Sequence, residues 1–262
     1  MCLMVMALRV HHEYPLILAA NRDEFDDRPT IPASFWPDAP WVLAGRDERG
    51  GGTWLGVNTG GRLAMVTNFR DPKHKDPGRL SRGKLAADYL LEKEDHEQFR
   101  ARLRRTGYRY NGFNLVFGCG PRLSWFSNAG GELCCIPSGV HGLSNALFNT
   151  PWPKVQRAKA GLWALLHSGR RPQVEELFAL LADTARPPDR ELPNTGVGLA
   201  KERLLAPICV QTAGYGTQVS TLIFVHRSGQ IDFWEKDVRT RSCCNGSGGH
   251  VRRFTIAGKR FV

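Results

Sequence analysis

A cysteine at the second position is the first residue of this chain with chemistry of its own. Cys2 directly follows Met1. A methionine before so small a residue is normally removed after synthesis, which leaves the cysteine with a free α-amine. That amine titrates at about 7.7–8.0, so part of it is an unprotonated base at neutral pH. One residue then supplies nucleophile and base together. Alternatively, Cys2 is a small apolar residue at the start of a buried strand.

A charged quartet follows an apolar strand that we predict at residues 16–20. Its members are Asn21, Arg22, Asp23 and Glu24. If this strand pairs with the first one, Arg22 and Asp23 lie near Cys2. An arginine there can hold a thiolate or a substrate carboxylate, and an aspartate can orient the terminal amine. The same charges also suit a solvated turn in which they satisfy one another.

Three glycines at 50–52 stand beside a strand predicted at 53–57, in a segment that also contains Arg46 and Trp54. Consecutive glycines let a backbone approach a ligand closely or turn sharply. The segment lacks the Gly-Lys-Ser/Thr ending of a phosphate loop, so that class of site is excluded.

Asn68 ends the next predicted strand, at 63–67. A side-chain amide at such a place can donate to a developing oxyanion, or it can cap a turn. Further along the chain, two short motifs stand out. They are Gly-Leu-Ser-Asn at 142–145, followed by Trp152 and Lys154, and Tyr-Gly-Thr-Gln at 215–218.

Each motif alone is weak, but their order along the chain resembles the Transport and Golgi organisation 2 family, also called the Asn-Arg-Asp-Glu family. The resemblance extends over nearly the whole chain. It rests on Met-Cys at 1–2, the quartet at 21–24, Gly-Gly-Gly-Thr-Trp-Leu-Gly-Val-Asn at 50–58, Thr-Asn-Phe-Arg at 67–70, and the two later motifs.

The resemblance implies an N-terminal-nucleophile-type fold of the α+β class, a four-layer αββα sandwich of two antiparallel sheets between helices. The fold is more distantly similar to that of penicillin V acylases and bile salt hydrolases, whose nucleophile is a cysteine exposed by removal of methionine. On that comparison Cys2 is nucleophile and base, Arg22 or Asp23 supports it, Asn68 forms an oxyanion hole with a backbone N–H, and Asn145 orients the amine. The expected catalytic set is Cys2, Asp23, Asn68 and Asn145, and the expected ligand-binding set is Asn21, Arg22, Glu24, Arg46, Trp54, Arg70 and Gln218.

One position departs from the family pattern. The family usually reads Tyr-Gly-Thr-Arg before the late strand, whereas this chain has Gln218. If the arginine positions the nucleophile, a neutral amide weakens catalysis. The amide equally suits a different ligand.

The family is associated with intracellular haem trafficking, with acyl-coenzyme A and lipid homeostasis, and with organisation of the secretory pathway. The resemblance therefore implies a cytoplasmic handler of an amphipathic anion, haem or acyl-coenzyme A, that requires no cofactor. The alternative is an active Cys2 amidohydrolase that acts on a non-peptide amide, because likeness of fold does not establish activity.

The composition restricts the other classes. The 262 residues carry a net charge of +11 with 42% hydrophobic and 23% charged residues, as in an ordinary globular chain. We expect one domain over 1–262. The positive charge favours anions or is simply a solvated basic face, and no nucleic-acid-binding motif accompanies it. No apolar run reaches the roughly 20 residues of a membrane-spanning helix. Seven cysteines without a C-x-x-C pair indicate no metal site and a reducing, cytoplasmic compartment.

The elements that must position these residues are strands at both ends of the chain and helices in the middle. Hydrophobic periodicity predicts strands at 2–10, 16–20, 41–44, 53–57, 63–67, 113–117, 123–126, 219–225 and 231–235, and helices after 81, at 155–166 and at 174–181. The segment 26–40 contains four prolines and is expected to be a loop.

Overall fold

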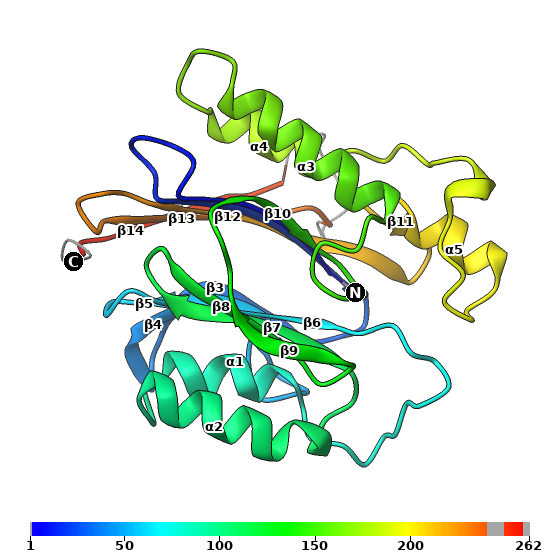
Figure 1. Ribbon diagram of the computed structural model, residues 1–262, viewed down its shortest axis with the longest axis horizontal. Coiled ribbons are helices and arrows are strands. Elements are labelled where there is room, and N and C mark those ends of the chain that lie inside the picture. The colour runs from blue at the N-terminus through cyan, green and yellow to red at the C-terminus, as the bar shows by residue number, and fades with distance from the viewer. Residues whose placement is uncertain (1, 240–248, 259–262) are drawn as a thin grey trace.

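The computed structural model describes residues 2–239 and 249–258, which form four layers (Figure 1). Helices α3 (Pro153–Leu166) and α4 (Val174–Leu181) cover one seven-stranded sheet, and α1 (Gly83–Leu90) and α2 (His96–Thr106) cover another. The two sheets face each other between the helical layers. The α+β class and the αββα layer order implied by the resemblance are therefore confirmed.

The first sheet has the order β10-β1-β2-β12-β13-β14, with β11 paired to β12, and every pairing is antiparallel. Its strands are β1 (Cys2–Leu8), β2 (Leu16–Phe25), β10 (Gly139–Leu143), β11 (Gln211–Thr212), β12 (Tyr215–Val225), β13 (Ile231–Asp237) and β14 (Val251–Ile256). Strand β2 pairs with β1 on one side and with β12 on the other. Segments from opposite ends of the sequence therefore lie side by side at the centre of one sheet.

The second sheet runs in sequence order from β3 to β9 and is also antiparallel. Its strands are β3 (Thr30–Trp36), β4 (Ala39–Asp47), β5 (Leu55–Asn58), β6 (Arg62–Asn68), β7 (Phe113–Cys119), β8 (Arg122–Ser127) and β9 (Gly131–Cys135). Helix α5 (Leu199–Leu205) and two short 3-10 turns, Gly107–Arg109 and Asp189–Glu191, complete the described elements.

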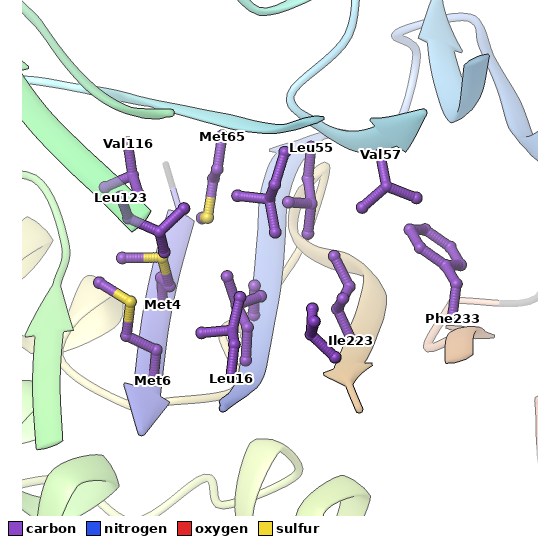
Figure 2. Close-up of a cluster of buried hydrophobic side chains, with 14 of the residues drawn as sticks. Met4, Met6, Leu16, Leu55, Val57, Met65, Val116, Leu123, Ile223 and Phe233 are labelled. Atoms are coloured by element: carbon purple, nitrogen blue, oxygen red, sulfur yellow. The ribbon is translucent and has the colours of Figure 1, made fainter. Parts of the chain in front are cut away.

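The core between the sheets follows from the two-residue period of a strand, which sends alternate side chains to opposite faces. Along β1, Met4 and Met6 point toward the second sheet, where they meet Met65 and Leu123 (Figure 2). The intervening Leu3, Val5 and Ala7 pack under α3 and α4 instead. Both faces of β1 are covered, and the strand is accordingly apolar throughout. This packing fixes the position of its first residue, Cys2.

Helix α3 follows the predicted apolar stripe and begins where Pro153 sets the first turn. Its buried residues include Val155, Ala158 and Leu162, which pack on the first sheet. The predicted helix at 174–181 and the hairpin at 219–235, with Gly229 at a φ of 91° in its turn, are also confirmed.

The loop expected at 26–40 is wrong, because most of this segment lies in β3 and the start of β4. The physical reason is position in the sheet: β3 is an edge strand, so Pro32 lies where the pairing register shifts between Ile31 and Ser34 and no ladder hydrogen bond is needed. Pro37 falls in the turn between the two strands. Strands β9, β10 and β14 and helix α5 were not predicted either.

Candidate functional site

The pairing of β1 with β2 places Cys2 directly opposite Arg22. Strand β2 does not end at Ala20 but continues to Phe25, so the quartet at 21–24 is part of the sheet and not a solvated turn. Three of its four residues are buried. Cys2 therefore starts its strand among charged side chains that are withdrawn from water.

Cys2 lies at the end of the core between the sheets and keeps 8% of its surface exposed. Burial raises the pKa of its thiol, and the negative charge of Asp23 acts in the same direction, while Arg22 and a hydrogen bond from the backbone N–H of Asp23 oppose it. The carbonyl oxygen of Cys2 accepts a 3.1 Å hydrogen bond from the hydroxyl of Ser144. The thiol is thus held in its neutral form within reach of Asp23.

The carboxyl group of Asp23 is fixed by the neighbouring strand. Thr217 donates from Oγ1 to Oδ1 of Asp23 over 2.7 Å, and the same Thr217 oxygen accepts from the backbone N–H of Val210 over 2.9 Å. Asp23 is 1% exposed, and its burial raises the pKa of the carboxyl despite the nearby positive charges of Lys154 and Arg70.

Lys154, in the first turn of α3, points from the helical layer toward this carboxyl. Its ammonium is 3% exposed, donates to the carbonyl of Leu205 over 3.0 Å and interacts electrostatically with Asp23 and Cys2. Burial lowers the pKa of Lys154 to about 8, against the raising effect of Asp23. At neutral pH a small share of this amine is unprotonated and can accept a proton.

Arg70 and Glu202 form a buried ion pair beside Lys154. Nη1 of Arg70 lies 2.6 Å from Oε2 of Glu202, and both side chains are less than a tenth exposed. The Arg70 guanidinium also stacks over Trp152 at 4.8 Å. The pair ties helix α5 to the segment just after β6, and Glu202 also accepts from Thr195.

A second charged group lies on the face of β2 that looks toward the second sheet. The guanidinium of Arg22 is 4.4 Å from the ring of Trp54, and it lies 3.8 Å from Glu24. Arg28 approaches the same carboxylate at 3.7 Å, and Arg82 interacts electrostatically with both Glu24 and Cys2. Cys2 is the residue at which this group and the Asp23–Lys154 group meet.

The two asparagines named from the sequence are brought together. Asn145 donates from Nδ2 to the backbone oxygen of Asn68 over 2.8 Å, and its own carbonyl accepts from the backbone of Arg70 over 2.7 Å. The oxygen of the Asn145 amide accepts from Ser144 at 3.4 Å. Asn145 thus joins the end of β6 to the segment after β10, and Ser144 connects this joint to Cys2.

Three of the expected ligand-binding residues are engaged by the fold. Asn21 faces the helical layer, where it donates to the carbonyls of Leu181 and Ile208 and accepts from Ser220. Arg46 pairs with Asp38 at 2.6 Å and stacks over Trp36, and none of its described interactions reaches the Cys2 group. Gln218 occupies the bulge between Thr217 and Val219, where it donates to the backbone of Glu24 and to Asp26.

Of the glycines at 50–52, Gly52 allows the close packing of α1. A Cβ on Gly52 would lie 2.4 Å from the backbone of Gly83, so this close approach requires glycine. Gly45 is needed for the same reason: a Cβ there would lie 2.1 Å from the ring of Trp54. The backbone of this loop therefore does make a close approach, but to the backbone of Gly83 at the start of α1.

Lys154 and Glu202 are site residues that the sequence did not assign a role. The signal for Lys154 was present, because it stands four residues before Ala158 and eight before Leu162, on the buried stripe of α3. A lone charge on an apolar stripe needs a buried partner. Among the described residues, no three His, Cys, Asp or Glu side chains are grouped to hold a metal ion.

Residues 1–240 match the family described as Transport and Golgi organisation 2. The chain belongs to this family. Among its relatives are the Transport and Golgi organization protein 2 homologs of Bos taurus, 36% identical, and Homo sapiens, 34% identical. Each alignment covers 86% of this chain and 87% of the relative.

Among solved structures, the chain is similar to the Caenorhabditis elegans ortholog of N-acylethanolamine-hydrolyzing acid amidase. The TM-score is 0.49 at 10% identity, over 85% of this chain and 92% of the other. Within the described ranges, this family member has no helix with the length and apolar character needed to cross a membrane.

Proposed function

We propose that this protein binds and hands on an amphipathic anion of the haem or acyl-coenzyme A class at the Cys2 end of β1 and β2. The proposal rests on the burial of Arg22 and on the distance between its guanidinium and the carboxylate of Glu24. The side chain of Arg22 is 4% exposed, and the Glu24 carboxylate oxygen that its guanidinium faces lies 3.8 Å away, beyond hydrogen-bond length. A buried guanidinium gains most from a charge-assisted hydrogen bond, which a ligand carboxylate or phosphate supplies.

The surroundings of Arg22 suit the apolar part of such a ligand. Trp54 lies against the guanidinium, and Cys2 continues the hydrophobic core between the sheets. Arg82, the N-cap residue of α1, adds positive charge that interacts with the Glu24 carboxylate. The anionic head of a ligand would therefore contact Arg22 and Arg82, and its apolar body would contact Trp54 and side chains of the core.

The raised pKa of the Cys2 thiol favours binding over catalysis in the chain that retains Met1. Reactive cysteines have a lowered pKa, because the thiolate is the nucleophile. Burial raises the pKa of Cys2, so its thiol is neutral at physiological pH.

The proposal is tested by titrating the purified chain with haem, followed by absorbance, and with palmitoyl-coenzyme A, followed by calorimetry. Arg22→Gln is expected to weaken binding by about tenfold or more, the value of one charge-assisted contact. Arg190→Gln removes the same charge from a side chain that is 82% exposed, and is expected to bind as the parent does. The proposal is refuted if neither ligand binds saturably at micromolar concentration.

A second candidate, an N-terminal-cysteine amidohydrolase, is favoured by the meeting of Cys2 with Asp23 and Lys154. The backbone of Asp23 donates toward the sulfur, and Lys154, with a pKa of about 8, can take up a proton. This mechanism needs the amine of Cys2 to be free, and Met1 lies outside the described residues.

The second candidate has its own test. Intact mass shows whether Met1 is removed, and release of product from simple amides is compared between the parent and Cys2→Ala. The bulge that holds Gln218 faces Asp26, so an arginine there has a carboxylate partner. If the pocket is a weakened hydrolase, Gln218→Arg raises turnover; an unchanged rate in both variants excludes this candidate.

A further inference from the structure

A cavity of about 770 Å³ lies on the helix-facing side of the first sheet, between α4 and the strands β13 and β14. The hairpin between β1 and β2 contributes Tyr14 to its wall, and α4 contributes Phe178. Its size falls within the range of about 300–1,000 Å³ that is typical of small-molecule sites.

The antiparallel register explains which side chains line this cavity. On β13, Asp232, Trp234 and Lys236 are two residues apart and so share one face. Their partners on β14 include Arg253, opposite Trp234, and Val251, opposite Lys236. Cations and apolar side chains therefore alternate across the two strands on the same surface.

Each cation of the cavity stands over an aromatic ring. Arg253 lies 5.5 Å from the ring of Trp234, Lys236 lies 5.6 Å from that of Phe178, and Arg171 lies 5.1 Å from that of Tyr14. Such contacts hold a cation against an apolar wall without neutralising its charge.

Arg171 pairs with Glu13 at 3.9 Å, but the carboxylates of the cavity leave the charges of Lys236 and Arg253 largely uncompensated. Asp232 accepts from His226 and from Thr255, both over 2.7 Å, and so is occupied within the sheet. Glu175 lines the opposite wall, on α4. Among the described residues, no carboxylate oxygen lies within 4.0 Å of the charged nitrogens of Lys236 or Arg253.

From this arrangement we infer a second ligand site, which takes a small amphipathic anion: an aromatic or aliphatic body against Phe178 and Trp234, and a carboxylate, sulfonate or phosphate head on Lys236 and Arg253. The head replaces water on two cations whose side chains are already positioned by the sheet. The body also covers the part of Trp234 that is exposed to water, which is favourable.

This site is separate from the Cys2 site. Strands β2 and β12 stand between β1 and β13, so β13 lies roughly 14 Å from β1 at the usual strand spacing. Cys2 points to the core between the sheets, whereas the cavity opens on the opposite face. The inference therefore goes beyond the proposed function and fails or holds independently of it.

The test uses 8-anilinonaphthalene-1-sulfonate, a fluorescent aromatic sulfonate, with the full chain. Lys236→Gln combined with Arg253→Gln is compared with Arg104→Gln combined with Arg105→Gln. The control pair makes the same charge change on exposed residues of α2, in the other helical layer. Thermal unfolding of both double variants confirms that the fold is intact.

We expect the dye to bind the parent and the control at one saturable site, and to bind the cavity variant at least about tenfold more weakly. Dodecanoate is expected to displace it, whereas inorganic phosphate, which has no apolar body, is not. Equal dye affinity in both double variants, or full displacement by inorganic phosphate, would overturn the inference. A loss of dye binding in Arg22→Gln but not in the cavity variant would assign the dye to the Cys2 site, and would also overturn it.

Discussion

Thr217 donates a 2.7 Å hydrogen bond to Asp23 from the neighbouring strand, and both side chains are at most 1% exposed. The pairing of β2 with β12 puts the two residues directly opposite each other. This bond fixes the carboxyl group next to Cys2 at the point where β2, near the start of the chain, pairs with β12, near its end. The geometry of the site therefore depends on a contact between residues 194 positions apart.

Thr217→Val is expected to destabilise the protein by about 1–3 kcal/mol, because it removes the hydroxyl that donates to the buried Asp23 carboxyl group and that accepts from the N–H of Val210. Valine has nearly the same shape as threonine, so little packing is lost. Urea unfolding measures the free energy, with Thr59→Val in an exposed turn as control. Equal stability of both variants would show that the Thr217 hydroxyl does not hold Asp23.

Lys154 is expected to make stability depend on pH above neutrality. Its pKa is lowered from 10.5 to about 8 in the folded chain, so the unfolded chain binds more protons between these values. Stability therefore rises with pH across this window, by up to about 3 kcal/mol. Denaturant titrations at both ends of the window should show this rise in the parent and in Lys201→Met, an exposed control on α5, but not in Lys154→Met. A rise that persists in Lys154→Met would assign the effect to other groups.

Glu235 has the opposite effect at lower pH. It lies in β13, is 1% exposed and accepts from the backbone N–H of Ala33 in the second sheet over 2.7 Å. Burial raises the pKa of Glu235 from 4.5 to about 7, so the folded chain binds more protons in this range. Stability is expected to fall as pH rises from 4.5 to 7, by up to about 3 kcal/mol.

Glu235→Gln keeps an acceptor for Ala33 and removes the titration, so its stability should be flatter over the same range. Unfolding free energies at the two ends of the range are the measurement. If parent and variant lose stability in parallel, the carboxyl group of Glu235 is not the cause.

The thiol of Cys2 is expected to react slowly in the chain that retains Met1. Burial raises the pKa of both Cys2 and Cys134, but Cys134 and Cys135 are exposed to reagents whereas Cys2 is buried. Iodoacetamide at neutral pH, followed by peptide mapping, should therefore label Cys134 and Cys135 first and Cys2 only after unfolding. Preferential labelling of Cys2 in the folded protein would instead support the amidohydrolase.

Strand β1 and the apolar part of β2 could be predicted from the sequence, because apolar runs are local signals, but the continuation of β2 through the quartet to Phe25 was not. Arg22 and Asp23 were placed near Cys2 on that ground, and the register of β1 with β2 agrees. Strand β3 was missed because four prolines outweighed the fact that an edge strand tolerates them. Strand β10, next to β1, is linked to it by a long-range pairing that no local pattern reveals.

The partners of the site residues were less predictable than the elements. Asn21 donates to the carbonyls of Leu181 and Ile208, and these partners depend on which side of β2 the helices cover. The resemblance placed Arg46 at the ligand, but its partner is Asp38, eight residues earlier in the turn between β3 and β4. Met1, whose removal the hydrolase mechanism requires, lies outside the described residues, as do two of the seven cysteines, Cys243 and Cys244.

The most direct test of the proposed function is native mass spectrometry of the purified chain after incubation with palmitoyl-coenzyme A or haem, with Arg22→Gln measured in parallel. The spectrum also reports the mass of the N-terminus. We predict a non-covalent complex with one of these ligands in the parent, and its loss in Arg22→Gln. A chain that remains unbound with both ligands, or an acyl group covalently attached to Cys2 of a chain without Met1, would contradict the binding account.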